Sequence, residues 1–255
     1  MSTFDPVEPE IDDLTDPRSP LSRTLITVAA TAVVVLLVVG LVLGVGRLTR
    51  TTETTAETFT ADPTQPLRFV VENLDVRVVP ASADDITVDA EVVGGWLGTD
   101  YETEQTGGDI LLTASCQPLL IPGCGGSVTI GVPAGAQFEL QASGQDVDLA
   151  GIDGVATIRT GSGDVTGSDL VMVDLGVTTS SGDVDLAFAQ QPLGLKTTTD
   201  SGDVDVVVPA GDVTYDVVTV ADSGDVESDL EPGGDGSEGF IAIETDSGDV
   251  TLEER

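Results

Sequence analysis

The chain has 255 residues and a formal net charge of −36, with 45 acidic residues against 9 basic ones and no histidine. So acidic a chain repels nucleic-acid phosphates, which argues against DNA or RNA as partners and favours cations or cationic partners. The alternative is that the acidic excess is a solubility adaptation to high salt. The missing histidine excludes Ser-His-Asp and Cys-His catalysis, and also histidine-ligated zinc or iron.

The N-terminal part predicts a short acidic cytoplasmic tail, residues 1–23, followed by a transmembrane helix, residues 24–46. The second segment contains no charged residue and is rich in Val, Leu and Ala. At about 1.5 Å per residue it would extend over about 34 Å, enough to cross a bilayer. A secretory signal peptide has a basic start and a shorter apolar stretch, so we expect a single-pass anchor in the plasma membrane.

The next segment, residues 47–66, reads as a threonine-rich stalk. From Thr51 to Pro66 the sequence is TTETTAETFTADPTQP, with few apolar side chains and two prolines. Such a composition is typical of a solvated linker rather than a packed element.

The two cysteines, Cys116 and Cys124, predict a disulfide that would fix the orientation of the anchor. They flank the short loop QPLLIPG. Disulfides persist outside the cytoplasm, so we expect the tail to be cytoplasmic and the C-terminal domain extracytoplasmic. The alternative is two unpaired thiols in an irregular loop. The flanking arginines do not decide the orientation, because two lie on each side of the apolar segment.

Residues 67–255 contain a repeat with a period of about 20 residues, which is the signature of a solenoid. The copies are GSGDVTG, SSGDVDL, DSGDVDV, DSGDVES and DSGDVTL, and their turn serines are Ser162, Ser181, Ser201, Ser223 and Ser247. Residues before each turn alternate with period 2, and a valine follows at the third position after every serine. This pattern indicates strands with one buried face. Each repeat therefore predicts a strand, a tight Ser-Gly corner with positive φ at the glycine, and a second strand.

We expect an all-β fold in which these rungs stack in parallel register as a β-solenoid, with each repeat on its neighbour in the sequence. The alternative is an antiparallel sandwich with repeated hairpins. Upstream, Leu74-Asp75-Val76 and Gly108-Asp109-Ile110 resemble degenerate corners, and Ile86 to Val92 alternates as a strand. Two VPAG segments, at Val132 and Val208, mark predicted strand exits, because proline cannot donate to a ladder.

A parallel stack would align the aspartates of the corners about 4.8 Å apart. Aligned carboxylates repel, so they must extend into solvent, accept backbone N–H bonds or bind cations. Turn hydrogen bonding is the simpler interpretation, and calcium held by oxygen ligands is the alternative. The candidate calcium ligands are the acids of the last three corners: Asp200, Asp203, Asp222, Asp225, Asp246 and Asp249.

The SGDV corners, the VPAG segments and the N-terminal anchor together resemble the bacterial β-strand repeat domains labelled “putative adhesin”, which are related to toast-rack-like domains. The resemblance covers residues 67–255. It implies a β-solenoid and a role in surface adhesion or envelope-stress sensing, with an envelope protein or surface component as partner.

We therefore expect a non-enzymatic, membrane-anchored surface module without a catalytic site or cofactor. The alternatives are a β-helix-type carbohydrate-active enzyme using clustered carboxylates and a calcium-stabilised surface domain. The enzyme would need aromatic platforms, and the chain has only 1 Trp and 2 Tyr.

Overall fold

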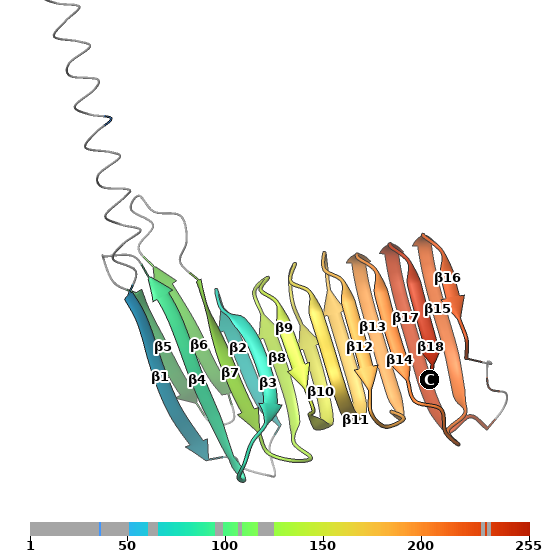
Figure 1. The fold of residues 1–255 in the computed structure, drawn as a ribbon, viewed down its shortest axis with the longest axis horizontal. Coiled ribbons are helices and arrows are strands. Elements are labelled where there is room, and N and C mark those ends of the chain that lie inside the picture. Colours follow the sequence, from blue (N-terminus) through green and yellow to red (C-terminus); the bar gives the residue numbers. More distant parts are fainter. Residues whose placement is uncertain are drawn as a thin grey trace, which may run out of the picture. The chain divides into compact units, whose positions relative to one another are not determined.

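The computed structural model describes residue 36 and residues 51–60, 66–94, 99–106, 109–116, 125–230, 233 and 236–255. The chain forms two compact units, Met1–Thr49 and Arg50–Arg255, and the architecture below is that of the second. No helix in the described ranges is long and apolar enough to cross a membrane. The predicted tail and transmembrane helix lie outside these ranges, apart from Leu36. The regular elements described in the second unit are strands (Figure 1), which confirms the all-β expectation.

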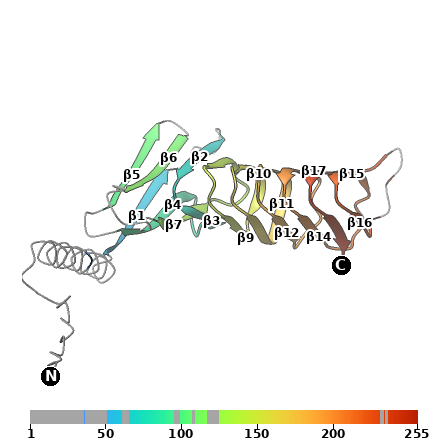
Figure 2. The ribbon, with the colours of Figure 1, turned by 90° about the horizontal axis from the view of Figure 1, so that it is seen from above.

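The strands form two layers, sheet A and sheet B, that face each other across the core (Figure 2). In spatial order, sheet A contains β1 (Thr51–Thr60), β4 (Asp85–Gly94), β7 (Gly125–Val132), β3 (Asp75–Pro80), β9 (Val147–Ala150), the first half of β11 (Val165–Thr179), β12 (Val184–Phe188), β14 (Val204–Val208), β18 (Val250–Glu254) and β16 (Val226–Ser228). Sheet B contains β5 (Thr99–Thr106), β6 (Asp109–Cys116), β2 (Leu67–Glu72), β8 (Gln137–Ala142), β10 (Asp153–Arg159), the second half of β11, β13 (Gly194–Ser201), β17 (Gly239–Ser247) and β15 (Tyr215–Ser223).

The predicted parallel register of the SGDV rungs is confirmed. Each rung consists of one strand of sheet B, a corner and one strand of sheet A. The valine after each corner aligns with its counterpart in the next rung, as in Val184 with Val204 and Val204 with Val250. Inward positions such as Val184, Val204 and Ile241 are fully buried, because the period-2 pattern places them between the sheets.

The order of the rungs differs from the order of the repeats, and the expectation that each repeat stacks on its neighbour in sequence is wrong at both ends. At the C-terminal end, β13 pairs with β17 and β14 pairs with β18, so the rung β15/β16 is outermost. At the other end, β2/β3 lies between β6/β7 and β8/β9. Neighbouring repeats are nearly identical in register, so pairing alone does not favour the sequential order over this one.

The expected stalk is also wrong for Thr51–Thr60. These residues form β1, which pairs antiparallel with β4 along its full length. Threonine is β-branched and favours extended strands, and Thr55, Glu57 and Phe59 are half-buried while their neighbours are exposed. The polar sequence of this segment suits a strand at the edge of a sheet.

The upstream corners agree with the structure in one case and differ in the other. A turn at Asn73 and Leu74, with φ 64° at Asn73, joins β2 to β3 as expected. In contrast, Asp109 pairs with Thr106 where β6 runs antiparallel to β5 in sheet B, so Asp109 does not begin a strand of the other sheet. Gly108 lies outside the described residues. The strand at Ile86–Val92 lies within β4, and the VPAG segments begin where β7 and β14 end.

The corner glycines are required by close packing of the rungs. A Cβ added at Gly182 would collide with the Gly163 carbonyl, and one added at Gly163 would collide with the Gln145 carbonyl. Neither of these glycines has a positive φ, whereas the corner glycines Gly202, Gly224 and Gly248 have φ of 159°, 159° and 152°. The positive φ expected from the sequence is therefore confirmed at three of the five SGDV corners. Inside the stack, Thr199 Oγ1 donates to the Gly182 carbonyl at 3.5 Å.

Candidate functional site

The corner aspartates form a ladder of hydrogen bonds between rungs. The backbone N–H of Asp183 donates to Asp164 Oδ1 at 3.0 Å, and that of Asp203 donates to Asp183 Oδ1 at 2.9 Å. The ladder continues from Asp249 N–H to Asp203 Oδ1 at 2.8 Å and from Asp225 N–H to Asp249 Oδ1 at 2.9 Å. Each carboxylate is therefore held by the neighbouring corner, and the order follows the spatial stack rather than the sequence.

The predicted calcium ligands are brought together only as two parallel rows. Asp203, Asp249 and Asp225 belong to the ladder, while Asp200, Asp246 and Asp222 precede corner serines that are aligned with one another. In the described part of the chain, no group of three or more acidic or cysteine side chains has an arrangement that could hold a metal ion. The interactions that the structure shows for the ladder carboxylates are the hydrogen bonds from the adjacent rung.

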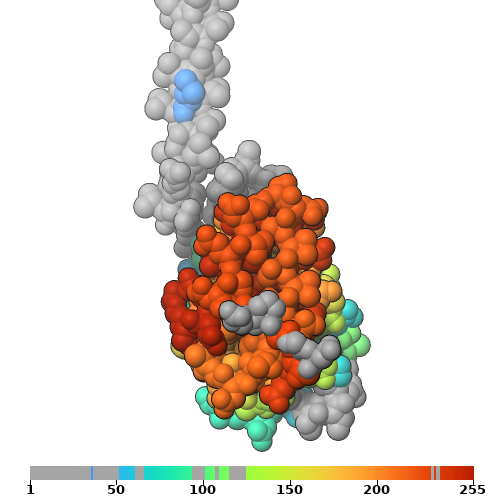
Figure 3. Space-filling view, turned by 90° about the vertical axis from the view of Figure 1, so that its right-hand side faces the viewer, coloured from blue at the N-terminus to red at the C-terminus, as the bar shows by residue number. Residues whose placement is uncertain are grey.

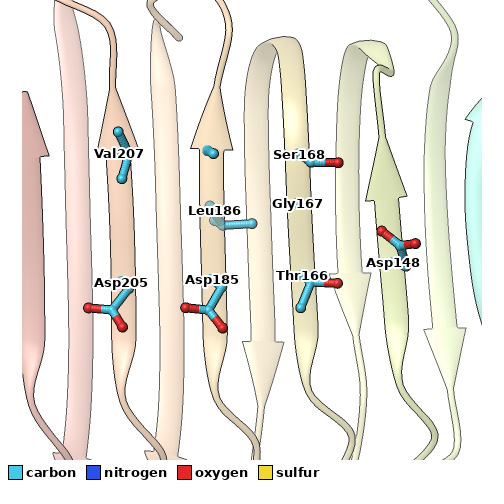
Figure 4. Close-up of a pocket in the computed structure, with 9 residues that line it drawn as sticks. Asp148, Thr166, Gly167, Ser168, Asp185, Leu186, Asp205 and Val207 are labelled. Carbon is cyan, nitrogen blue, oxygen red and sulfur yellow. The ribbon is translucent and has the colours of Figure 1, made fainter. Parts of the chain in front are cut away.

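A second acidic row lies on the outer surface of sheet A. Asp148 aligns with Thr166, Thr166 with Asp185, and Asp185 with Asp205, one residue from each successive rung. Figure 4 shows these four side chains side by side across neighbouring strands. We name this row, Asp148, Thr166, Asp185 and Asp205, the acidic face.

The acidic face borders a shallow depression of ≈ 390 Å³. The residues two positions further along the strands are small, and they form the other side of the depression: Ser168, Ala187 and Val207. A bulge in β11 between Gly167 and Leu170 adds to its width, because two residues there face a single residue of β12. Asp169, within the bulge, has φ 53°.

A neighbouring depression of ≈ 440 Å³ extends the acidic surface towards β3 and β7. Its lining includes Asp75, Asp146 and Asp164, together with Arg77. Arg77 forms an ion pair with Asp148, with Nη1 and Oδ2 3.2 Å apart. Neither lining contains an aromatic residue.

Within the acidic face, Asp185 has a raised pKa. Partial burial raises the pKa of Asp185, and the carboxylates of Asp205, Asp183 and Asp164 raise it further. The ionised form of Asp185 is therefore disfavoured in the folded protein, and a cationic group bound beside it would offset this effect.

The aromatic residues and the cysteines occupy other places. Tyr215 is buried, as expected of a core residue, and its hydroxyl donates to the Pro192 carbonyl at 2.9 Å. Burial, with a smaller contribution from Glu254, raises the pKa of Tyr215 to about 12. Cys116 ends β6, but Cys124 and Trp96 lie outside the described residues, so the disulfide stays a prediction.

The sequence contained a signal for the acidic face, but none of the candidate calcium ligands belongs to this face. The residue after each corner valine is outward-facing and is often acidic, as at Asp185 and Asp205. Small residues two positions later, such as Ser168 and Ala187, mark where the surface is hollow. The part played by Asp148 depends on the alignment of β9 with β11, which the sequence alone did not give.

Comparison with known proteins identifies the repeat domain. The family model described as Toastrack DUF4097 matches residues 99–253. No curated protein matches the chain.

Several solved structures resemble the chain at low identity. A “putative cell adhesion protein” from Clostridium sporogenes is 10% identical with a TM-score of 0.44, and the alignment covers 80% of this chain and 100% of that one. A “putative adhesin” from Bacteroides fragilis is 11% identical with a TM-score of 0.44, covering 79% of this chain and 97% of that one. A “putative lipid binding protein” from Parabacteroides distasonis is 11% identical with a TM-score of 0.34, again covering 79% and 97%. Likenesses of this degree do not identify a ligand.

Proposed function

The chain belongs to the Toastrack DUF4097 family, and on this premise we propose that it is a non-enzymatic interaction module of the cell surface. Its contact surface is the acidic face of sheet A, and its partner is a cationic component of the envelope. The apolar segment at residues 24–46 anchors the module, and the repeat domain lies outside the membrane.

The observation that carries this proposal is the row of outward-facing side chains on sheet A, in which the carboxylates of Asp185 and Asp205 lie on adjacent strands. Parallel rungs place Asp185 and Asp205 in register, about 4.8 Å apart. A partner with similarly spaced cations would gain several opposite-charge contacts at once, and it would lower the repulsion within the row. The small residues Ser168 and Ala187 allow such a partner to approach the strands closely.

An enzymatic role has less support. Glycoside hydrolysis needs two carboxyl groups that converge on one bond. The acids of the acidic face instead lie in a row on one surface, and the two depressions are lined without aromatic side chains that could stack on a sugar.

Photo-crosslinking in the native membrane tests the proposal. A photoreactive residue at Thr166 of the full chain should give a discrete crosslinked product, and the double variant Asp185→Asn/Asp205→Asn should reduce its yield. The control position is Lys196, an exposed residue of β13 on sheet B. Equal products from both positions, or a yield that the double variant leaves unchanged, would refute the acidic face as the contact surface.

The anchor and orientation need a separate measurement. Protease added to intact spheroplasts should remove a C-terminal tag and leave an N-terminal tag protected. The reverse pattern, or complete protection of both tags, would overturn the proposed topology.

A further inference from the structure

Exposed apolar side chains gather at the end of the stack formed by the last rungs, which faces the viewer in Figure 3. Val218 and Val220 of β15 are 47% and 43% exposed, and Val226 of β16 is 42% exposed. Phe240 of β17 and Leu193, whose carbonyl accepts from the Phe240 N–H, are also exposed. Such a group of apolar residues at one end of a soluble domain indicates a contact surface.

The same end of the stack is an open sheet edge. Among the described strands, β15 pairs only with β17, and β16 pairs only with β18. Val217, Thr219 and Ala221 face the core but are only half-buried, whereas Ile241 and Ile243 in the next rung are 0% and 1% exposed. An open repeat stack needs a cover, and a free edge is a template for another strand.

The hydrogen bonds between corners indicate how such a strand would attach. At each contact between two corners of the SGDV stack, the aspartate N–H of one corner donates to the aspartate Oδ1 of the other. The valine N–H of that other corner donates back to the aspartate carbonyl of the first. For Asp225 these bonds are Asp225 N–H to Asp249 Oδ1 and Val250 N–H to Asp225 O, both 2.9 Å. Beyond it no described corner follows, so the Asp225 carboxylate and the Val226 N–H are the acceptor and donor that the next strand would meet.

The negative charge at this edge favours a partner strand that carries cationic side chains. The exposed side chains around the apolar residues are acidic: Asp216, Asp222, Asp225, Glu227 and Asp229. A second copy of the chain would bring the same acids, and two like charges 4 Å apart repel by about 1 kcal/mol in water. A strand with cations at matching positions would instead form opposite-charge cross-strand pairs.

We propose that the edge of β15 and β16 binds an extended segment of a partner protein by strand addition. This segment has a short apolar stretch flanked by Lys or Arg. The apolar stretch covers Val217, Thr219 and Ala221 and extends the outer surface formed by Val218 and Val220. The flanking cations lie beside Asp216 and Asp222. This surface is distinct from the acidic face, so either proposal can fail alone.

The test measures binding of a labelled peptide to the full chain in non-ionic detergent at low salt. The peptide, Lys-Val-Val-Thr-Val-Ala-Lys, is the β15 sequence from Asp216 to Asp222 with both aspartates replaced by lysine. Fluorescence anisotropy should show saturable binding, and hydrogen exchange of β15 amides should slow. Charge reversal in Asp216→Lys/Asp222→Lys should weaken binding by about tenfold, consistent with the loss of two cross-strand charge pairs. The reversed variant should in turn prefer the acidic peptide Asp-Val-Val-Thr-Val-Ala-Asp.

Three controls make the outcome decisive. The peptide Lys-Val-Val-Pro-Val-Ala-Lys has the same charge but cannot form the ladder, so it should bind at least tenfold more weakly. Asp185→Asn/Asp205→Asn in the acidic face should leave binding unchanged. Equal binding of the proline peptide would show attraction by charge alone. Tighter binding of the acidic peptide to the natural chain would show self-association. Absence of binding by any of the peptides would show that the edge stays free. Each of these three results overturns the proposal.

Discussion

The corner aspartates show how one residue type links every rung to the next. Asp203 has two roles in the ladder, because its N–H donates to Asp183 and its carboxylate accepts from Asp249. The carboxylate is exposed, so its hydrogen bond contributes little more than a typical net amount. The same charges repel along the ladder, and the two effects oppose each other.

Substitutions at Asp203 separate the hydrogen bond from the charge. Asp203→Asn keeps an oxygen acceptor for the Asp249 N–H and removes the charge, whereas Asp203→Ala removes both. We expect the alanine variant to have a free energy of unfolding about 1 kcal/mol lower than that of the asparagine variant. Urea denaturation at low salt measures the difference, and equal stabilities would mean that the ladder bond contributes nothing.

Asp185 gives a pH-dependent prediction. Its raised pKa means that the folded protein favours the protonated carboxyl. The stability linked to this group is fully present below its ordinary value of 3.8 and is lost as pH rises through the folded pKa. Asp185→Asn should therefore raise the melting temperature at pH 7. It should have no effect at a pH low enough to protonate Asp185 in both the folded and the unfolded state. Glu244→Gln, an exposed acid of β17 on sheet B, is the control, and a benefit at pH 7 that persists unchanged in acid would contradict this account.

At the scale of the element, the rung is a strand, a corner and a strand whose backbones approach closely. The sequence was sufficient to predict the strands and their buried faces, because the period-2 pattern and the VPAG segments are local signals. It was insufficient for β1, since a threonine-rich segment can be a linker or an edge strand, and β4 decides between them. The spatial order of the rungs could not be predicted from the sequence either, because near-identical repeats provide equivalent pairing partners.

Gly182 tests the close approach of two rungs. In Gly182→Ala the new methyl group would meet the Gly163 carbonyl, and the next residue in the chain, Asp164, is held by the hydrogen bond from its N–H to Asp146 Oδ1. We expect a loss of about 1–3 kcal/mol in the free energy of unfolding, as for overpacked sites. The matched control is Gly161→Ala, where the added atom would make only an ordinary contact of 3.7 Å with Gly144. Similar losses in both variants would exclude rung packing as the cause.

At the scale of the whole molecule, the net charge of −36 dominates. The ladder and the acidic face both place carboxylates in adjacent rungs, so the folded state concentrates charge that the unfolded chain disperses. The candidate site was only partly predictable for the same reason. The sequence identified which aspartates are outward-facing, but acids occur throughout the chain, and only the alignment of β9, β11, β12 and β14 shows which of them form one row.

Salt should therefore stabilise the protein through screening rather than through a specific ion. We expect the melting temperature of the full chain to rise between low salt and 1 M sodium chloride, where the Debye length falls to about 3 Å. Millimolar calcium at fixed ionic strength should have no further effect. A rise produced by calcium alone would show binding to the folded state and would restore Asp203, Asp249 and Asp225 as candidate ligands.

The central structural claim is that parallel rungs stack with β17/β18 between β13/β14 and β15/β16. Paired cysteines test it directly, because Ser201 aligns with Ser247, and Ser247 aligns with Ser223. Neighbouring strands bring such positions within the distance that a disulfide spans. Mass-spectrometric mapping after mild oxidation should find a crosslink in Ser201→Cys/Ser247→Cys and none in Ser201→Cys/Ser223→Cys. The opposite result would restore the sequential order of the repeats and would contradict the described stack, including its open edge.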